Sequence, residues 1–365
     1  MKAWVHYGFS DMRLEDIPDP TIEPLHVIVK VNVVQPSITE ALLSQGLPTF
    51  PKLVEAAKRR LAEKTPIQLF GHEFAGEIIE VGEGVEHLRV GDRVTAKAAI
   101  ACHECSNCRT GRPHFCLNTK FLGFDIPGAL AEYALIPAQI LYRLPDSLSD
   151  SEGATMQPLG ECVTAVAKVG LNAGDTVAVL GQGAMGLSSM QAAKNTGAGR
   201  LIVTDIRDEA LEMARQLGAD EVIDAQEIDP VEKVLELTDG IGPDLVIEAA
   251  SGSRKVGLSG TDTFYQAVEM VSAGGKILEI SHFEKPLENL TTGIFRHKAI
   301  QWIFPASTTD KMMEHTINLA ASGRIQQKPL IIHVVEGIEN LPEVLEITTN
   351  KPKHRTLNPA QLKIV

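Results

Sequence analysis

The chain has 365 residues, 44% of them apolar and 22% charged, which is ordinary for a globular protein and sufficient for two domains. Its net charge of −13 argues against a nucleic-acid or anionic-membrane partner, because such a surface needs a basic patch. No apolar stretch approaches the ~18 residues of a membrane span, and the N-terminus lacks the apolar region of an export signal. We therefore expect a cytoplasmic protein.

Short β-branched runs separated by proline and glycine fill roughly the first 150 residues and predict a β-rich, barrel-like domain. The runs lie at residues 26–34, 74–82, 92–100 and 130–137. One segment differs, because Leu53–Lys64 places Leu53, Ala56, Ala57 and Leu61 on a single helical face. We expect one amphipathic helix there.

Four of the five cysteines lie close together, with the spacing C-x2-C-x2-C-x7-C. They are Cys102, Cys105, Cys108 and Cys116. Four thiolates at this loop spacing can close tetrahedrally on Zn²⁺ with no open position, which is typical of a structural site, one per chain. An iron–sulfur cluster is the alternative on spacing alone. We expect the remaining Cys162 to be a small buried apolar residue.

From about Ser151 the chain alternates helices and strands, which predicts βαβ units and a parallel sheet. Strands are expected at 176–181, 200–206, 221–224, 244–250 and 276–281, and helices at 160–169, 186–197, 208–218, 230–238 and ending near 271. The Gly/Ser-rich segment 251–263 is expected to form a mobile surface loop. The alternation ends near Leu290, so we expect the last segment to return to the first domain.

The segment Val177–Lys194 contains a G-x-G-x-x-G motif after a buried strand, formed by Gly181, Gly183 and Gly186. The first glycine allows a tight turn, the second lets backbone amides approach a diphosphate, and the third lets helix and strand pack closely. Ala184 and Met185 then open a helix whose unpaired N–H groups attract phosphate. The pattern predicts a dinucleotide-binding site.

Asp205 ends the next predicted strand at about the ~20-residue distance expected of a ribose-binding acid. A carboxylate at this position accepts ribose hydroxyls and repels a 2′-phosphate, so the sequence favours NAD over NADP. Arg207 either stacks near the adenine or faces solvent.

The motifs together resemble the zinc-containing medium-chain alcohol and polyol dehydrogenases, with threonine and sorbitol dehydrogenases nearest. The resemblance covers nearly the whole chain, and it includes residues 71–94, the cysteine lobe, residues 157–186 and the order of the two domains. It implies an α/β protein with a GroES-like β-rich catalytic domain and a Rossmann domain with a doubly wound parallel sheet. The expected divisions are residues 1–155, with the zinc lobe at about 98–118, then 156–295, then a return over 296–365. A homodimer or homotetramer is implied, with hydride passing between a carbinol carbon and nicotinamide C4.

In that family a catalytic zinc is held partly by a Cys-x-Thr/Ser-Asp segment after an N-terminal strand. Aligning "VVQPSITE" by its strand puts Ser37 at the cysteine, Thr39 at the proton-relay hydroxyl and Glu40 at the aspartate. The alternative alignment, with Thr39 at the cysteine, also loses the thiolate. The usual first ligand is therefore missing in either case.

The family's Gly-His-Glu segment is intact as His72 and Glu73, but Gln157 stands where the relatives carry a glutamate. A serine hydroxyl and a glutamine amide supply no charge to Zn²⁺ near neutral pH. We therefore expect a weak or absent catalytic zinc at His72 and Glu73, or else an acid/base pair formed by these two residues.

The sequence thus predicts an NAD-dependent oxidoreductase acting on a secondary alcohol, a polyol or the corresponding ketone. Two alternatives remain open: a zinc-independent enone or quinone reductase of the same fold, and a non-catalytic NAD-binding protein. The excursion 47–69 lies between two active-site segments and forms either a lid or a partner-contact helix.

Overall fold

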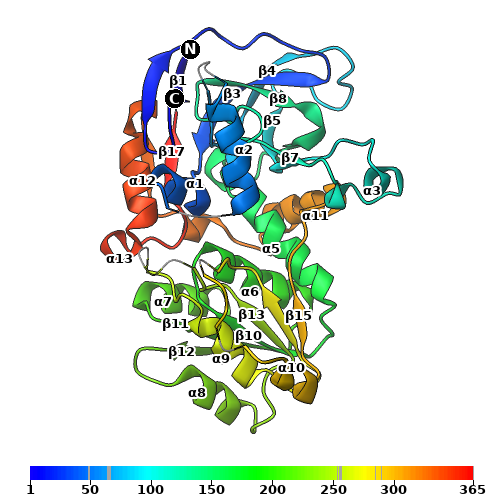
Figure 1. Cartoon of the computed structure of the whole chain (residues 1–365), viewed down its shortest axis with the longest axis vertical. Helices are drawn as coiled ribbons and strands as arrows, with labels where there is room; N and C mark the ends of the chain where they lie inside the picture. The colour runs from blue at the N-terminus through cyan, green and yellow to red at the C-terminus, as the bar shows by residue number, and fades with distance from the viewer. Residues whose placement is uncertain are drawn as a thin grey trace.

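The computed structural model describes residues 1–47, 50–63, 67–252, 254, 257–283, 285–288 and 290–364, and it contains two domains arranged end to end (Figure 1). We call them the β-rich domain and the parallel-sheet domain. Both chain ends lie in the β-rich domain, and the helix α5 (Met156–Val169) leads into the other (Figure 1). No helix in the described ranges is long and apolar enough to cross a membrane.

The β-rich domain is built on a seven-stranded sheet with the path β16-β17-β3-β4-β5-β9, and β8 pairs on β3. β3 is central because its side chains are apolar almost without a break and it pairs with three strands. The strands of this domain are β1 (Lys2–His6), β2 (Met12–Asp16), β3 (His26–Val34), β4 (Phe74–Val81), β5 (Arg93–Ala96), β6 (Ala99–Ile100), β7 (Lys120–Phe121), β8 (Tyr133–Pro137), β9 (Leu141–Arg143), β16 (Val334–Glu336) and β17 (Gln361–Lys363). The four runs expected to form strands do so, the third divided between β5 and β6.

Short helices surround this sheet. They are α1 (Ile38–Ser44), α2 (Pro51–Leu61), α3 (Ser106–Arg109), α4 (Asp150–Ala154), α12 (Leu341–Thr349) and α13 (Lys351–His354), with 3-10 turns at Pro113–Phe115, Ala138–Ile140, Lys328–Leu330 and Ile338–Asn340. The helix expected over Leu53–Lys64 is α2, which starts two residues earlier and buries Ala56 and Ala57. Lys64 lies outside the described residues.

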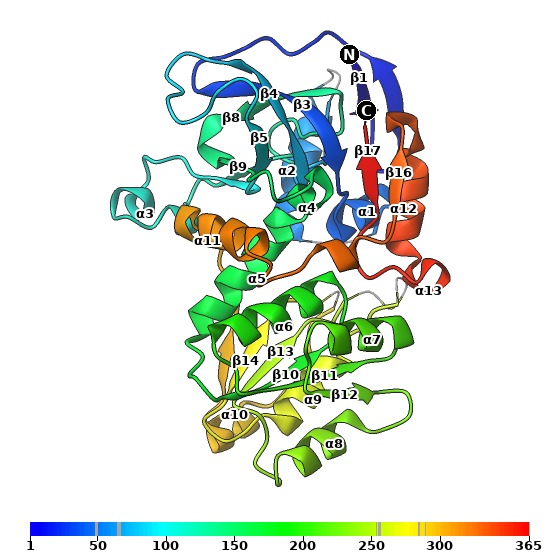
Figure 2. The ribbon, with the colours of Figure 1, turned by 180° about the vertical axis from the view of Figure 1, so that it is seen from behind.

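The parallel-sheet domain has six strands in the order β12-β11-β10-β13-β14-β15, all parallel. The strands are β10 (Thr176–Leu180), β11 (Arg200–Asp205), β12 (Glu221–Asp224), β13 (Leu245–Glu248), β14 (Lys276–Glu279) and β15 (Gln301–Ile303). The helices are α6 (Ala184–Thr196), α7 (Asp208–Gln216), α8 (Pro230–Leu237), α9 (Asp262–Met270), α10 (Thr292–Lys298) and α11 (Asp310–Ala321). Figure 2 shows α6 and α7 on the face opposite α8 and α9, which confirms the doubly wound arrangement.

The expected boundary at residue 295 is wrong, because the parallel sheet continues past it. β15 pairs in parallel with β14, as Lys276 lies opposite Gln301 and Leu278 opposite Ile303. The strand has only three residues, "QWI", so no β-branched run marks it in the sequence. The chain returns to the β-rich domain only beyond this strand.

The described part of the 251–263 segment is held to the end of β13 at both of its ends, where the Ser251 amide and the Thr263 hydroxyl donate to Oε1 of Glu248 at 2.9 Å and 2.6 Å. Gly252 and Gly260 form a β-bridge, and the Ser259 amide donates to the Ala250 carbonyl at 3.0 Å. Ser251 is buried, so the expectation of a mobile surface loop is wrong at this end. Residues 253, 255 and 256 lie outside the described residues.

Candidate functional site

The glycine motif forms the turn between β10 and α6. Gly181 has a φ of +87°, which favours glycine, and a Cβ on Gly186 would lie 1.8 Å from the Gly181 carbonyl oxygen. Gly183 caps α6, and a Cβ there would meet nothing within 4 Å. Ala184 and Met185 form the first turn, which no side chain caps. The turn therefore leaves open space in front of unpaired amides, which fits a dinucleotide diphosphate.

Asp205 ends β11 beside this turn, and its carboxylate already accepts several hydrogen bonds. Oδ2 accepts from the Gln182 amide at 2.6 Å, and Oδ1 accepts from the Ile206 amide at 2.8 Å and the Arg207 amide at 3.0 Å. The Arg207 guanidinium adds an ion pair, with Nε 3.2 Å from Oδ1. Arg207 therefore covers Asp205 and does not simply face solvent.

Two further carboxylates, Glu248 and Glu279, end the adjacent strands β13 and β14 in the same register. Both are buried, and Ser281 hydrogen-bonds to both, at 2.5 Å from Oε1 of Glu279. Burial and the neighbouring Glu248 raise the pKa of Glu279 to about 10. Glu279 therefore keeps its proton at neutral pH. No local motif in the sequence marks either carboxylate, because the register of β13 and β14 brings them together.

In the β-rich domain, Ser37 and Glu40 form a capping box at the start of α1. The Ser37 Oγ accepts from the Glu40 amide at 3.2 Å, and the Glu40 Oε2 accepts from the Ser37 amide at 3.0 Å. Thr39 lies in the first turn of α1 and is half-buried. The Ser37 hydroxyl thus serves as a helix cap.

The other carboxylate oxygen of Glu40 holds the Gly-His-Glu segment. Oε1 accepts from the Gly71 amide at 2.8 Å and lies 2.6 Å from Nδ1 of His72. Burial opposes a charge on His72, but the Glu40 carboxylate outweighs it and, together with Glu73, raises the pKa of His72 to about 9. The imidazole is therefore held positive at neutral pH.

Glu73 lies on the opposite side of this ring, with Oε1 3.7 Å from Nε2 of His72. Its Oε2 accepts from Nε2 of Gln35 at 2.6 Å, and Gln35 in turn accepts from the amides of Asn358 and Gln361. Burial raises the pKa of Glu73 to about 7. The end of the chain therefore orients this carboxylate through Gln35.

Gln157 occupies the first turn of α5, and Glu161 lies one turn further along the same face. The Gln157 Nε2 donates to Oε1 of Glu161 at 3.4 Å, and the Thr308 amide lies 3.5 Å from the same oxygen. Burial raises the pKa of Glu161 to about 7, while Thr308 and then His72 lower it. Glu161 was not among the residues predicted for the site, although its four-residue spacing from Gln157 places both on one face of α5 and is a signal that identifies it.

The residues around His72 and Glu73 do not form a favourable site for a tightly bound catalytic metal. In the described ranges, the four-cysteine lobe is the only group of three or more His, Cys, Asp or Glu ligand atoms within 4.8 Å of one another. Ser37 is engaged in its cap, and Gln157 contributes a neutral amide. The structure thus brings His72 and Glu73 together but assembles no complete ligand set around them.

The cysteine lobe fits Zn²⁺ well and projects to one side of the molecule beside α3 (Figure 1). Sγ–Sγ distances are 3.5 Å for Cys105–Cys108, 3.5 Å for Cys102–Cys116 and 4.0 Å for Cys105–Cys116. Backbone N–H groups, first that of Cys108, lower the pKa of Cys105 to about 6, which favours the thiolate that binds metal. Cys162 is fully buried against Met185, as expected.

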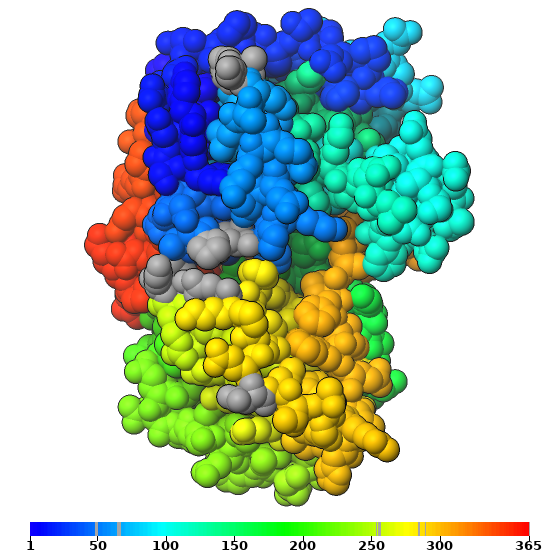
Figure 3. Space-filling model, viewed as in Figure 1, coloured from blue at the N-terminus to red at the C-terminus, as the bar shows by residue number. Residues whose placement is uncertain are grey.

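The excursion 47–69 contacts the other domain. Phe50, at the start of α2, stacks against His282, with 4.3 Å between ring centroids. His282 follows β14 and the Glu248–Glu279 pair. Figure 3 shows the α2 segment on the front face of the β-rich domain, extending down toward the parallel-sheet domain. The excursion therefore reaches across to the domain that carries the glycine motif.

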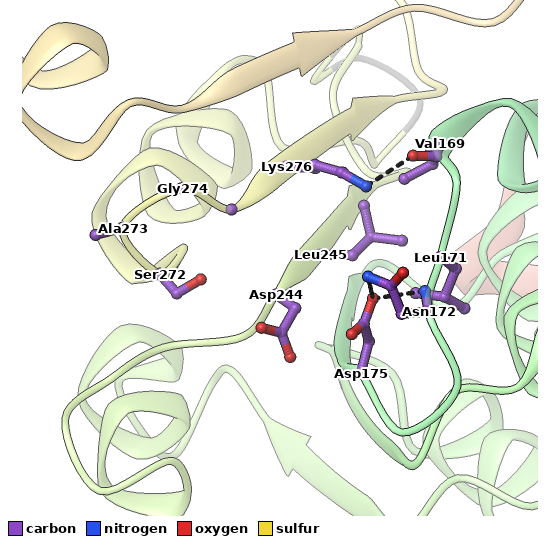
Figure 4. Close-up of a pocket in the computed structure, with 11 residues that line it drawn as sticks. Val169, Leu171, Asn172, Asp175, Asp244, Leu245, Ser272, Ala273, Gly274 and Lys276 are labelled. Carbon is purple, nitrogen blue, oxygen red and sulfur yellow. Dashed lines mark hydrogen bonds between the residues drawn. The ribbon is translucent and has the colours of Figure 1, made fainter.

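A separate hollow of about 140 Å³ lies between the ends of β10, β13 and β14 that are remote from the glycine turn (Figure 4). Its lining includes Asn172, Asp175, Asp244 and Lys276. Ligands of open α/β sheets bind at the carboxyl ends of the strands, and this hollow lies at the amino ends. It is therefore not part of the candidate site.

Two family models match the chain. The model described as "Alcohol dehydrogenase GroES-like domain" matches residues 25–146, and the model described as "Zinc-binding dehydrogenase" matches residues 184–322. Among curated proteins, an L-threonine 3-dehydrogenase of Bacillus licheniformis is 34% identical over 91% of each chain. A sorbitol dehydrogenase of Halalkalibacterium halodurans is 30% identical over 91% of this chain and 92% of its own.

Solved structures agree with this similarity. A 2R,3R-butanediol dehydrogenase of Bacillus subtilis superposes with a TM-score of 0.83 and 26% identity, covering 100% of this chain and 99% of its own. An alcohol dehydrogenase of Thermus sp. superposes with a TM-score of 0.81 and 27% identity, and both chains are covered completely.

Proposed function

The chain belongs to the zinc-type medium-chain alcohol and polyol dehydrogenase family, and from that premise we propose that it is an NAD-dependent oxidoreductase acting on a secondary alcohol, a polyol or the corresponding ketone. Threonine, sorbitol and butanediol dehydrogenases are among the proteins similar to it, and all of these names describe hydroxyl-bearing substrates. The observation that carries the proposal is the buried contact of 2.6 Å between Glu40 and His72, which holds a positive imidazole beside Glu73 and Glu161.

The proposed cofactor is NAD. The support is the open space at Gly183, the uncapped first turn of α6 with Ala184 and Met185, and the carboxylate of Asp205 at the end of β11. When bound, the nicotinamide ring supplies or accepts the hydride at its C4 carbon. Gly181 and Gly186 keep the turn tight enough for the amides to reach the diphosphate.

The proposed proton chemistry belongs to His72. Its positive imidazole donates a proton from Nε2 to the substrate oxygen as the carbonyl carbon receives hydride, and it recovers the proton when an alcohol is oxidised. The charge also stabilises the developing alkoxide, as a Lewis acid does in a site with a metal. Glu73 and Glu161, with pKa values raised to about 7 mainly by burial, are suited to exchange that proton with solvent or to bind substrate hydroxyls. Thr39 is a further candidate for the relay.

For metal, we infer one structural zinc per chain at Cys102, Cys105, Cys108 and Cys116, and a weak or absent catalytic zinc. The convergence of four thiolates supports the first. The capping role of Ser37 and the neutral amide of Gln157 support the second. A homodimer or homotetramer is also proposed, and β15, one of the two edge strands of the six-stranded sheet, has an edge suited to pairing with another strand.

The decisive experiment measures NADH binding by nicotinamide fluorescence and then turnover on secondary alcohols, polyols, ketones and enones. We expect NADH binding and ketone or alcohol turnover. We expect His72→Asn to lose on the order of 10²-fold or more in kcat while still binding NADH. Activity on enones alone would favour the reductase, and binding without any turnover would favour a non-catalytic protein.

A further inference from the structure

The proposed dinucleotide site has two halves, and the second half lies over the ends of β13 and β14. In an open parallel sheet a dinucleotide lies across the carboxyl ends of the strands, at the point where the strand order reverses. That point lies between β10 and β13 (Figure 2). With the adenosine half proposed at Asp205 of β11, the nicotinamide half falls over β13 and β14 on the other side of this point.

A buried carboxyl group ends each of these two strands, Glu248 on β13 and Glu279 on β14. The turn after Glu248 packs against the glycine turn, since a Cβ on Gly181 would lie 2.7 Å from the Cβ of Ala250. The Ile280 amide donates to the Glu248 carbonyl at 3.0 Å, which joins the segment after β14 to the same place. The segments that follow the two carboxyl groups therefore border the proposed nicotinamide half.

Glu248 accepts hydrogen bonds at both of its carboxylate oxygens. Its Oε1 accepts from the amides of Ala250 and Ser251, each at 2.9 Å. The same oxygen accepts from the Thr263 hydroxyl at 2.6 Å, and Oε2 accepts from the Ser281 hydroxyl. Glu248 thus holds the turn after β13 and the start of α9, and it needs no proton of its own to do so.

Glu279 has fewer partners. Its Oε1 lies 2.5 Å from Oγ of Ser281, and its Oε2 is buried with no hydrogen-bond partner among the described residues. The Ser281 hydroxyl carries a single proton, so it cannot donate to Glu248 and Glu279 at the same time. A second proton is needed to join the two acids through Ser281. Burial, and then the neighbouring Glu248, raise the pKa of Glu279 to about 10, which keeps that proton on Glu279 at neutral pH.

We propose that Glu279 is a positioning residue for the nicotinamide half of the cofactor, because its protonated carboxyl group completes a chain of hydrogen bonds through Ser281 to Glu248. The chain ties the segment after β14 to the turn after β13, so it fixes both segments that border the nicotinamide ring. Without a donor at residue 279, Ser281 keeps only its contact with Glu248. This inference rests on the proposed function, since it concerns the same dinucleotide site.

The test compares NADH with ADP-ribose, which carries the adenosine and diphosphate groups but no nicotinamide. Dissociation constants are measured by titration calorimetry on the full chain. Glu279→Ala should weaken NADH by about tenfold or more and change ADP-ribose by less than about twofold, because the adenosine half is left unaltered. Ser281→Ala is a smaller change and should act in the same direction. Glu269→Ala, on the exposed face of α9, is the matched control and should change neither constant.

A conservative variant tests whether a hydrogen-bond donor is what matters at residue 279. In Glu279→Gln the side-chain amide keeps a donor next to Ser281, so the NADH dissociation constant should stay within about threefold of wild type. A loss of NADH affinity in Glu279→Gln as large as that in Glu279→Ala would overturn the role given to the proton.

The remaining outcomes separate this inference from the proposed function. Equal losses of NADH and ADP-ribose affinity in Glu279→Ala and Ser281→Ala would overturn the positioning role, because they would show that the whole domain depends on these residues. Unchanged NADH affinity in both variants would overturn it as well, and either result would leave the proposed function intact. Binding of neither NADH nor ADP-ribose by wild type would overturn the proposed function itself.

Discussion

The Nδ1 atom of His72 lies 2.6 Å from the Oε1 atom of Glu40, and both groups are buried. The other oxygen of this carboxylate, Oε2, accepts from the Ser37 amide at the start of α1. The first turn of α1 therefore holds the negative charge of Glu40 beside the imidazole. The segment in which the family resemblance places a metal-binding cysteine thus supplies the carboxylate of Glu40 instead, and this carboxylate contacts His72 of the Gly-His-Glu segment.

We expect Glu40→Gln to reduce kcat by about tenfold or more and to lower the pKa of His72, because a neutral amide no longer favours the imidazolium. His72 has a folded pKa of about 9, above its ordinary 6.5. Its stabilising contribution is therefore complete below pH 6.5 and is lost as the pH rises through about 9.

In Glu40→Gln the free energy of unfolding, measured by urea titration from pH 6 to 10, should fall less steeply with rising pH than in wild type. Glu55→Gln, on the exposed face of α2, is the matched control and should change neither the pH dependence of kcat nor that of the free energy of unfolding. An unaltered pH–rate profile in Glu40→Gln would contradict the role given to His72.

Two glycines of the same motif should respond differently to alanine. At Gly183 the added methyl meets no protein atom within 4 Å, so the free energy of unfolding should change by less than ~1 kcal/mol while NADH affinity falls about tenfold or more. At Gly186 the methyl would lie 1.8 Å from the Gly181 carbonyl oxygen, so we expect destabilisation of ~1–3 kcal/mol. Denaturant unfolding and NADH fluorescence distinguish the two, and unimpaired NADH binding by Gly183→Ala would contradict the position of the diphosphate.

Metal analysis of protein purified without chelators should give close to one zinc per chain. Cys108→Ser should lose that zinc and unfold at a lower temperature, because three thiolates cannot complete the tetrahedral site. Cys162→Ala is the control and should keep it, since Cys162 lies apart from the lobe. A value of two zinc ions per chain would refute the weak catalytic site inferred from Ser37 and Gln157.

Glu279→Gln should be tolerated near neutral pH. The folded pKa of Glu279 is raised from 4.5 to about 10, so its contribution to stability is complete below pH 4.5 and is lost as the pH rises toward 10. Glutamine keeps a neutral group that can donate to Glu248, so the variant should lose less stability than wild type between pH 7 and 10. Thermal unfolding across that range measures this, with Glu269→Gln on the exposed face of α9 as control. A steeper alkaline loss in Glu279→Gln would mean that Glu279 is ionised in the folded state.

Hydrophobic periodicity and turn residues identified most elements of both domains, because long apolar strands such as β3 and β11 leave clear patterns. β15 was missed because three residues at a sheet edge carry no periodicity. The glycine motif, Asp205 and the four cysteines are local signals, so their positions were readable directly from the chain.

The parts of the site that could not be predicted depend on contacts between distant segments. Glu40 acts on His72 across 32 positions of sequence, and the register of β13 and β14 brings Glu248 beside Glu279. The sequence does not decide the role of Arg207, because one of its two partners, the Thr356 carbonyl, lies far along the chain. Such pairings follow from tertiary packing and are not visible in local spacing.

The support of Glu73 by Gln35 has a consequence for synthesis. Gln35 is held by Asn358 and Gln361, and the latter belongs to β17, which pairs with β3. On the ribosome, roughly the first two hundred residues can emerge and begin to fold before Asn358 and Gln361 have been synthesised. During that time Gln35 lacks these partners, and the Glu73 side chain is not yet held in its orientation. A nascent chain therefore cannot complete its catalytic centre until Asn358 and Gln361 have emerged from the ribosome, and a chain cut before Asn358 should lose turnover before it loses nucleotide binding.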